Sequence, residues 1–313
     1  VQQIDLVVQQ GEVRFALGQH AAQLVALDEV GRLLREDDEP ARRGAWHYWK
    51  GFLTSITGGA VGESIEHCRV ASELADAAGL EELRARADCC LAQVHMIAGN
   101  LQEALDTGER ALAVFERRGD RWWSCRTLSQ LTPAANAMGL WERSEAYCAR
   151  ALEHGIALND LRLKVSGFIR IASTKIQRGD WQAGLAYCDK AEALGPVEYD
   201  AAALKAIRGR GLVAAGELEE GVDNIRKAIE WYSLLNLNFT VAQFSTWLCE
   251  GLLAKGDYSE AQIVALRFND ICRICGYRHL QKLFEDIVDR CDSSNGNLAT
   301  PQESHEHLLP KQG

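Results

Sequence analysis

The chain has 313 residues, a formal net charge of −10 at pH 7 and a sequence pI near 5.4, and this acidic balance argues against nucleic acid as the main partner. It contains no apolar run of about eighteen residues, and residues 1–5 lack the basic and apolar order of a secretory signal, so we expect a cytoplasmic protein that does not contact a membrane. Because 47% of the residues are apolar and only five are proline, the composition is typical of an all-helical protein.

A glycine returns along the chain at intervals of 37 to 41 residues, at Gly18, Gly59, Gly99, Gly139, Gly179, Gly216 and Gly256. Glycine can adopt the left-handed conformation that ends a helix and reverses the chain. A second set of turn residues lies between them, at Asp38, Gly79, Gly119, Asn159, Gly195, Asn236 and Gly276. The period near 40 residues, with two turns in each unit, predicts stacked helical hairpins in one domain.

Four columns of similar residues follow the turn glycines, at offsets of 2, 5, 9 and 12 residues. The residue at the first offset is mostly large and apolar, as in Trp141 and Trp181, and the one at the second is mostly small. Offsets three or four residues apart share one face of a helix, so the columns predict the packing face of the second helix in each hairpin. The single 37-residue interval and the Gly195-Pro196 turn indicate one deletion in the hairpin after Gly179.

The two ends of the chain differ in character. Apolar residues before Gly18 already follow helical spacing, so we expect a piece of a longer protein that begins partway through a helix. Residues 280–288 carry apolar side chains on one face and polar side chains on the other, which predicts a C-terminal capping helix. After Cys291 the composition is polar, so we expect a solenoid over residues 1–291 and a disordered tail over residues 292–313.

Motifs for catalysis or nucleotide binding are missing from the sequence: it contains no P-loop, no H-E-x-x-H and no G-x-S-x-G. The group with the best spacing for a metal is Cys272, Cys275 and His279, but no second pair of ligands is near it. Cys68 and Cys148 fall in the ninth-residue column, where a small apolar side chain belongs. We therefore expect no metal, no cofactor and no disulfide bond, and no catalysis by this chain itself.

The columns resemble the tetratricopeptide repeat. The segments most similar to it are Gly99-x-Leu101-x-x-Ala104 with Ala111, and Gly256-x-Tyr258-x-x-Ala261. The resemblance covers residues 1–290, and it departs from the common pattern because these units run near 40 residues where the family has about 34. It implies a right-handed superhelical solenoid of about seven hairpins with a C-terminal capping helix.

Long repeats of this kind are similar to those in bacterial ATPase-linked class III adenylate or guanylate cyclases, and to those in LuxR- and MalT-type transcriptional regulators. A LuxR-type regulator would carry a helix-turn-helix domain where only a short polar tail follows Cys291, which favours the cyclase arrangement. The resemblance implies a non-catalytic interaction or sensing scaffold attached to an upstream effector domain, and that domain would carry any enzyme activity. A free-standing adaptor remains open.

In the resembled family a protein or peptide partner binds in a groove lined by the first helix of each hairpin. Counting back from each turn glycine by 13, 10, 6 or 3 residues gives the expected groove residues Trp46, Trp49, Leu53, Arg86, Gln93, Arg126, Asn136, Arg210 and Gln243. Trp46 and Trp49 are the strongest candidate anchors, because tryptophan and arginine contribute much of the free energy of binding at interfaces. The alternative for both rings is packing between adjacent hairpins.

Overall fold

The computed structural model describes residues 2–298, and all regular secondary structure in this range is helical. The helices are α1 (Gln2–Gln9), α2 (Gly11–Ala16), α3 (His20–Gly31), α4 (Pro40–Ile56), α5 (Val61–Ala77), α6 (Glu81–Ala98), α7 (Leu101–Arg117), α8 (Arg121–Ala137), α9 (Trp141–Ala157), α10 (Leu161–Arg178), α11 (Trp181–Glu192), α12 (Glu198–Ala215), α13 (Leu218–Leu234), α14 (Asn238–Lys255), α15 (Tyr258–Cys275) and α16 (Arg278–Leu298).

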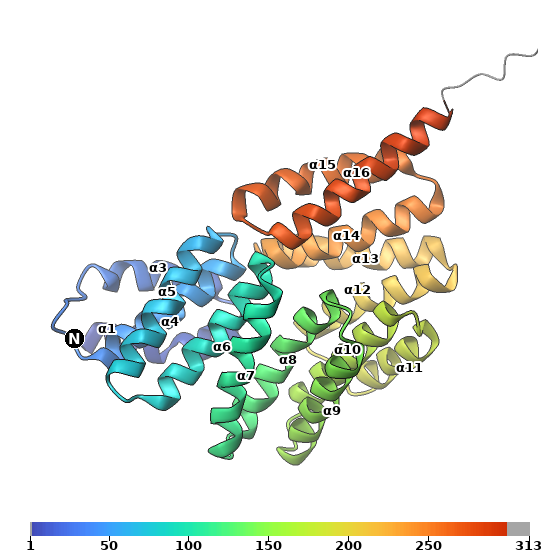
Figure 1. The fold of residues 1–313 in the computed structure, drawn as a ribbon. Coiled ribbons are helices and arrows are strands. Elements are labelled where there is room, and N and C mark those ends of the chain that lie inside the picture. The colour runs from blue at the N-terminus through green and yellow to red at the C-terminus, as the bar shows by residue number, and fades with distance from the viewer. Residues whose placement is uncertain (1, 299–313) are drawn as a thin grey trace, which may run out of the picture.

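These helices form seven hairpins and one final helix (Figure 1). The first hairpin pairs α1 and α2 with α3, and each even-numbered helix from α4 to α14 then pairs with the helix that follows it. Helix α16 packs on α15 and α14 and caps the stack. The structure confirms the predicted all-helical solenoid. Helix α11 has 12 residues where α9 has 17, which confirms the predicted deletion after Gly179.

The hairpin turns use left-handed residues, as the sequence predicts. Six of the seven predicted turn glycines have positive φ, with values between 69° and 100°. The exception is the second turn, where Gly58 takes the left-handed conformation (φ 87°) in place of Gly59. In the second set of turns Asn159 and Asn236 adopt φ values of 50° and 53°, whereas Asp38 has no positive φ and accepts a hydrogen bond from the Arg35 amide.

The second helix of each hairpin buries the predicted columns. Side chains at the offsets 5, 9 and 12 are buried in every hairpin; Ala104, Cys148 and Ala191 are examples, none more than 2% exposed. The residue at offset 2 is the first residue of each second helix, from His20 in α3 to Tyr258 in α15. Trp141 and Trp181 are only half-buried at this helix start, so the prediction that they are core residues was wrong.

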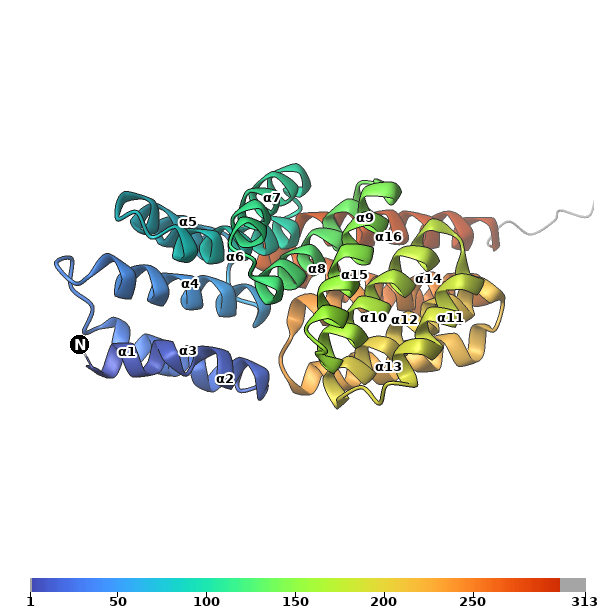
Figure 2. The ribbon, with the colours of Figure 1, turned by 90° about the horizontal axis from the view of Figure 1, so that it is seen from below.

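The stack curves because the two helices of a hairpin make different contacts. Each first helix from α4 to α14 packs on the first helix of the next hairpin or on α16, whereas each second helix packs on the first helix that follows it (Figure 2). Successive first helices therefore lie closer together and form the inner wall of the superhelix. Within residues 2–298 no helix has the length and apolar character needed to cross a membrane.

The superhelix closes on itself within one turn. Helix α14 contacts α4, and α16 contacts α6, so the last hairpins lie against the second and third (Figure 1). At this closure the Asn238 amide donates a hydrogen bond to the Thr57 carbonyl at 3.5 Å, and the Cys275 thiol lies 3.5 Å from the Gly58 carbonyl. The left-handed Gly99 leaves room for the backbone of His279, since a Cβ there would come within 2.9 Å of its amide nitrogen.

Both ends differ from the sequence expectation. The N-terminal helix is divided into α1 and α2, and Gly11 at the start of α2 leaves room for the Trp49 ring, since a Cβ there would lie 2.3 Å from it. At the other end α16 continues past Cys291 to Leu298, so the expected tail is helical over its first residues. The rest of that expected tail, residues 299–313, lies outside the described residues.

Candidate functional site

The candidate site is the inner wall formed by the first helices. Two groups of side chains combine arginine with tryptophan on this wall. We call them the Trp123 cluster, made of Arg86, Trp122, Trp123 and Arg126 with Phe15 and Phe52 beside them, and the Trp247 cluster, made of Arg210, Trp247 and Glu250. Helix α10 lies between the helices that carry the two clusters. Each cluster can therefore contact a different part of one extended partner.

In the Trp123 cluster two guanidinium groups lie over one indole ring. The central guanidinium carbon of Arg86 is 5.1 Å from the centroid of the Trp123 ring, and that of Arg126 is 5.5 Å from it. These distances fall within the range of cation–π contacts. Trp123 itself is only 5% exposed and stacks on Phe115, with 5.4 Å between the ring centroids. The buried ring gives both arginines a fixed support.

Helix α2 reaches this cluster from the first hairpin. The Phe15 ring centroid lies 5.3 Å from the Arg126 guanidinium, and a Glu12 carboxylate oxygen lies 3.6 Å from an Arg86 nitrogen. Arg86 also pairs with Glu82 one turn before it, at 2.6 Å. The break between α1 and α2 therefore brings an aromatic ring and a carboxylate to the wall formed by the third and fourth hairpins.

A chain of amide contacts continues this wall. The Gln130 side-chain amide donates to the Gln93 side-chain oxygen at 2.6 Å, and Cys89 donates to the Gln130 oxygen at 2.8 Å. Both glutamines are half-buried. Amide side chains that donate and accept are suited to hydrogen bonds with a peptide backbone.

The Trp247 cluster joins α12 to α14. The Arg210 guanidinium lies 5.1 Å from the Trp247 ring centroid and 3.3 Å from a carboxylate oxygen of Glu250. Burial lowers the pKa of Arg210, and the Glu250 carboxylate acts in the opposite direction. Gln243 is half-buried one turn before Trp247 on the same helix. The arginine of this cluster is therefore paired with a carboxylate.

Four of the residues predicted for the groove pack against other helices instead. Trp49 and Leu53 are 5% and 1% exposed, and Trp46 donates an indole hydrogen bond to the Leu27 carbonyl at 2.9 Å. These contacts correspond to the alternative that both tryptophans pack between hairpins. Asn136 is 7% exposed. Trp49, Leu53 and Asn136 are therefore buried, whereas Trp46 stays half-buried.

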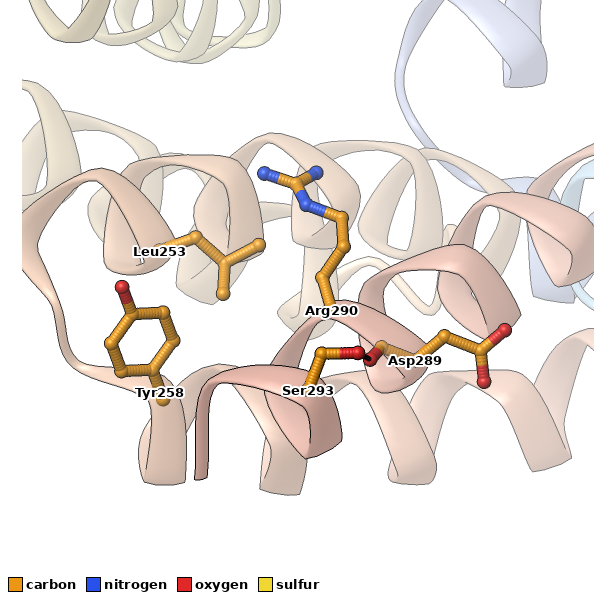
Figure 3. A pocket seen from close by; sticks show the side chains of 5 residues that line it. All are labelled: Leu253, Tyr258, Asp289, Arg290 and Ser293. Carbon is orange, nitrogen blue, oxygen red and sulfur yellow. Dashed lines mark hydrogen bonds between the residues drawn. The ribbon is translucent and has the colours of Figure 1, made fainter. Parts of the chain in front are cut away.

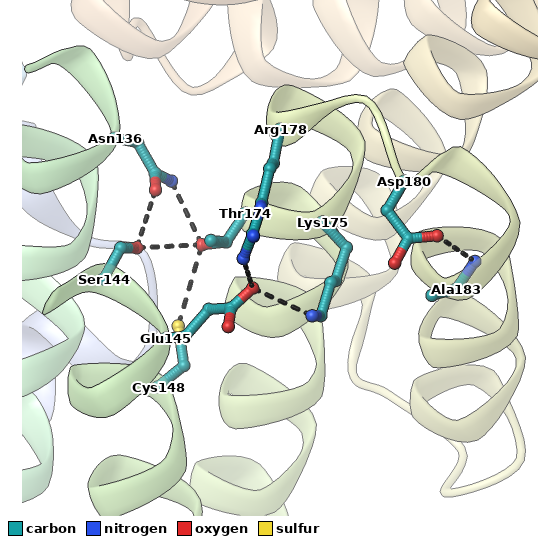
Figure 4. Close-up of polar contacts among 9 residues, drawn as sticks. All are labelled: Asn136, Ser144, Glu145, Cys148, Thr174, Lys175, Arg178, Asp180 and Ala183. Atoms are coloured by element: carbon teal, nitrogen blue, oxygen red, sulfur yellow. Dashed lines mark hydrogen bonds and ion pairs between the residues drawn. The ribbon is translucent and has the colours of Figure 1, made fainter. Parts of the chain in front are cut away.

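Asn136 belongs to a buried polar network between α8, α9 and α10 (Figure 4). Its amide donates to the Thr174 hydroxyl at 3.2 Å, and its carbonyl accepts from the Ser144 hydroxyl at 2.6 Å. The sulfur of Cys148 lies 3.7 Å from the same Thr174 oxygen. Outside this network, Glu145 pairs with Lys175 and Arg178 at 2.8 and 3.1 Å. The network fixes the fourth hairpin against the fifth, and it holds Asn136 in a buried position between them.

Several wall residues were missed from the sequence. Trp123 and Gln130 lie three residues before and four residues after Arg126, and Trp247 lies four residues after Gln243. These spacings place them on the same helix face as the predicted positions. Extending the predicted face by one turn in each direction would have found them.

A shallow hollow of about 410 Å³ lies at the C-terminal end of the solenoid (Figure 3). It is lined by Leu253 at the end of α14, Tyr258 at the start of α15, and Asp289, Arg290 and Ser293 on α16. The Ser293 hydroxyl is occupied, since it donates to the Asp289 carbonyl at 2.8 Å. Over residues 2–298 no group of three or more His, Cys, Asp or Glu side chains is arranged to hold a metal ion.

No family model and no curated protein matches the sequence. Solved structures do match. A Rap protein complexed with competence and sporulation factor has a TM-score of 0.57 at 10% identity, with 95% of this chain and 99% of that chain covered. The Rap conjugation gene regulator of plasmid pLS20, in complex with the Phr* peptide, has a TM-score of 0.55 at 9% identity, with 96% and 98% covered.

A third similar structure is a signal transduction ATPase with numerous domains, which carries a tetratricopeptide repeat sensor and comes from Pyrococcus horikoshii. Its TM-score is 0.50 at 12% identity, with 92% of this chain and 47% of that chain covered. At such low identities these likenesses bear on the fold alone. Together with the hairpin geometry, they show that this chain has a tetratricopeptide-like helical solenoid fold.

Proposed function

We propose that the chain is a non-catalytic scaffold that binds a protein segment or peptide along its inner wall. The observation that carries this proposal is the pair of arginine–tryptophan clusters on that wall. Tryptophan and arginine are the residue types that contribute most to the free energy of binding at protein interfaces. A curved stack of hairpins offers an extended concave surface for such a partner. Two of the structures similar in fold contain a bound factor or peptide, which supports the same use here.

The two clusters and the amides between them offer different kinds of contact along the length of the partner. At the Trp123 cluster the exposed Trp122 ring offers apolar surface, and the guanidinium groups over the buried Trp123 ring offer positive charge. The Gln93 and Gln130 amides offer hydrogen bonds, and the Trp247 cluster offers a paired charge. An extended peptide presents alternating side chains and a backbone that needs donors and acceptors. The inner wall therefore suits a peptide with polar and apolar side chains. We further propose that the protein is cytoplasmic and that its partner is neither nucleic acid nor a membrane.

Selection from a random peptide display library on immobilised chain tests this function. A selected peptide would be synthesised with a fluorescent label and its affinity measured by anisotropy. We expect Arg210→Gln on the inner wall to weaken binding about tenfold, which corresponds to about 1.4 kcal/mol. Arg226→Gln is the matched control, because Arg226 lies on the second helix α13 and pairs with Glu260 at the surface. Recovery of no peptide, or an affinity unchanged by Arg210→Gln, would contradict the proposal.

The second part of the proposal concerns the protein to which the scaffold belongs. We infer that it is the C-terminal sensing region of a larger bacterial signalling protein, such as an ATPase-linked adenylate or guanylate cyclase. The likeness to a repeat sensor within a multidomain ATPase supports this, because this chain covers only 47% of that protein. A regulator of the LuxR or MalT type is an alternative parent, and a free-standing adaptor is a second alternative.

Sequencing the coding DNA upstream of the Val1 codon separates these possibilities. An in-frame ATPase module preceded by a cyclase-like domain would support the larger signalling enzyme. A start codon within a few dozen residues would contradict it and leave a free-standing adaptor. The peptide selection described above remains informative in either case.

A further inference from the structure

The Arg126 guanidinium has aromatic neighbours but no anionic one. Its central carbon lies 5.2 to 5.7 Å from the ring centroids of Phe15, Phe52, Trp122 and Trp123. Across residues 2–298 no carboxylate lies within 4.0 Å of its nitrogens, and its enclosed Nε has no hydrogen-bond acceptor. A partly buried cation without a counter-charge is costly, and ring contacts offset only part of that cost.

The other two arginines of the clusters differ from Arg126 in this respect. Arg86 pairs with Glu82 and Glu12, and Arg210 pairs with Glu250. Arg126 is therefore the one arginine of the two clusters that has no carboxylate within 4.0 Å among the described residues. A carboxylate supplied by a partner would pair with it directly.

The N–H donors of the Arg126 guanidinium indicate which chemical group of a partner binds there. Rings cover the guanidinium but accept no strong N–H hydrogen bond, so its donors stay available along the edge of the plane. A planar carboxylate matches such an edge with two parallel hydrogen bonds. A carboxylate already reaches this cluster, since a Glu12 oxygen lies 3.6 Å from a nitrogen of Arg86.

We infer that Arg126 and its four rings bind a carboxylate of the peptide that occupies the inner wall. The inference rests on the proposed function and adds the class of partner: a peptide with an acidic side chain or a free C-terminal carboxylate at the Trp123 cluster. The rings of Phe15 and Trp122 then contact the carbon atoms next to that carboxylate. Phe15 comes from α2, so the first hairpin takes part in recognition.

The test uses pools of random nine-residue peptides, one with free C-termini and one with amidated C-termini. Wild-type chain captures peptides from each pool, and their sequences are read by mass spectrometry. We expect enrichment of Asp or Glu in both pools if a side chain is bound, or capture that depends on a free C-terminus if the terminal carboxylate is bound. Capture with neither preference contradicts the inference and leaves the proposed function standing, whereas no capture at all contradicts the proposed function.

A double-mutant cycle then assigns the preference to Arg126. Affinities are measured for the best peptide and for its version with the carboxylate replaced by an amide, each against wild-type chain and Arg126→Gln. We expect either change alone to weaken binding about tenfold and both together to weaken it no further. Additive effects would overturn the inference, because they would mean that Arg126 and the carboxylate act independently.

Two controls guard against a merely structural effect. Arg126→Lys keeps the charge and must keep the acidic preference, with circular dichroism confirming that both Arg126 variants retain the helical content and melting temperature of the wild type. Arg210→Gln must keep the acidic preference while lowering the overall affinity. Loss of the preference in either of these controls would contradict the assignment to Arg126.

Discussion

Substitution of Gly209 by alanine is expected to destabilise the solenoid by separating α12 from α13. A Cβ built at Gly209 would lie 2.6 Å from the Gly221 carbonyl oxygen and 2.8 Å from Cγ1 of Ile225. The reverse also holds, since a Cβ at Gly221 would lie 2.8 Å from the Gly209 carbonyl oxygen. Two helix backbones therefore meet at this pair of glycines, and backbone cannot move aside as a flexible side chain can.

The expected magnitude follows from two opposing effects. Alanine favours a helix interior over glycine by about 1 kcal/mol. To restore ordinary contact distances the helices must separate by about 0.5 to 1 Å, which forfeits a quarter to a half of the dispersion energy of each contact across the interface. Overpacking costs about 1 to 3 kcal/mol, and contact with rigid backbone places this site at about 2 to 3 kcal/mol. After the gain of about 1 kcal/mol from alanine, we expect a net loss of about 1 to 2 kcal/mol.

Urea unfolding followed by far-ultraviolet circular dichroism measures this loss as a lower midpoint. Gly62→Ala provides the matched control, because Gly62 lies in the first turn of α5 and a Cβ there would meet no atom within 4 Å. That variant should be as stable as the wild type or more stable, by up to about 1 kcal/mol. A Gly209→Ala variant that matches or exceeds the wild-type midpoint would refute the close-packing explanation.

Three further predictions concern buried polar groups and turns. Thr174→Val removes a partner from the Asn136 amide and should lower stability by about 1 to 3 kcal/mol in thermal melts, with Thr174→Ser nearly neutral. Asn236→Ala, at φ 53°, should cost about 1 kcal/mol, while Asn236→Gly should not. The pKa of His47 is lowered from 6.5 to about 4, mainly by burial and secondly by the charge of the neighbouring His67. The unfolded chain therefore binds a proton more readily, so the stability should fall as the pH drops from 6.5 towards 4. His47→Gln should flatten that slope, and an unchanged slope would contradict the cause.

The hairpin architecture could be predicted because its determinants are local in sequence. Each turn glycine lies two residues before a second helix, and the residues at offsets 5 and 12 lie within that helix, on the face that it buries. The break between α1 and α2 could not be predicted in this way. Gly11 lies at this point against the Trp49 ring, which is distant in sequence and reaches it only after the hairpins stack.

The candidate site was predicted in part for a related reason. Arg86 and Arg126 were identified, since polar residues at inner positions have no neighbouring helix to cover them. Trp49 and Leu53 occupy equivalent positions on α4, but that helix is covered by α1 on one side and touched by α14 on another. A count along the repeat treats all inner positions alike, whereas the closure of the superhelix and the first hairpin bury some of them. Binding at the remaining positions stays a prediction.

The closure between the two ends has a consequence for how the chain folds. In an open repeat stack each unit touches only its neighbours, so terminal units fray and folding spreads one unit at a time. Here the Asn238 amide meets the Thr57 carbonyl across 181 residues, and the Cys275 thiol meets the Gly58 carbonyl across 217 residues. Contacts of such long sequence separation form late, because the intervening loop must first be ordered. We therefore expect a final slow folding step, after which α14 to α16 exchange their amide hydrogens about as slowly as the central hairpins.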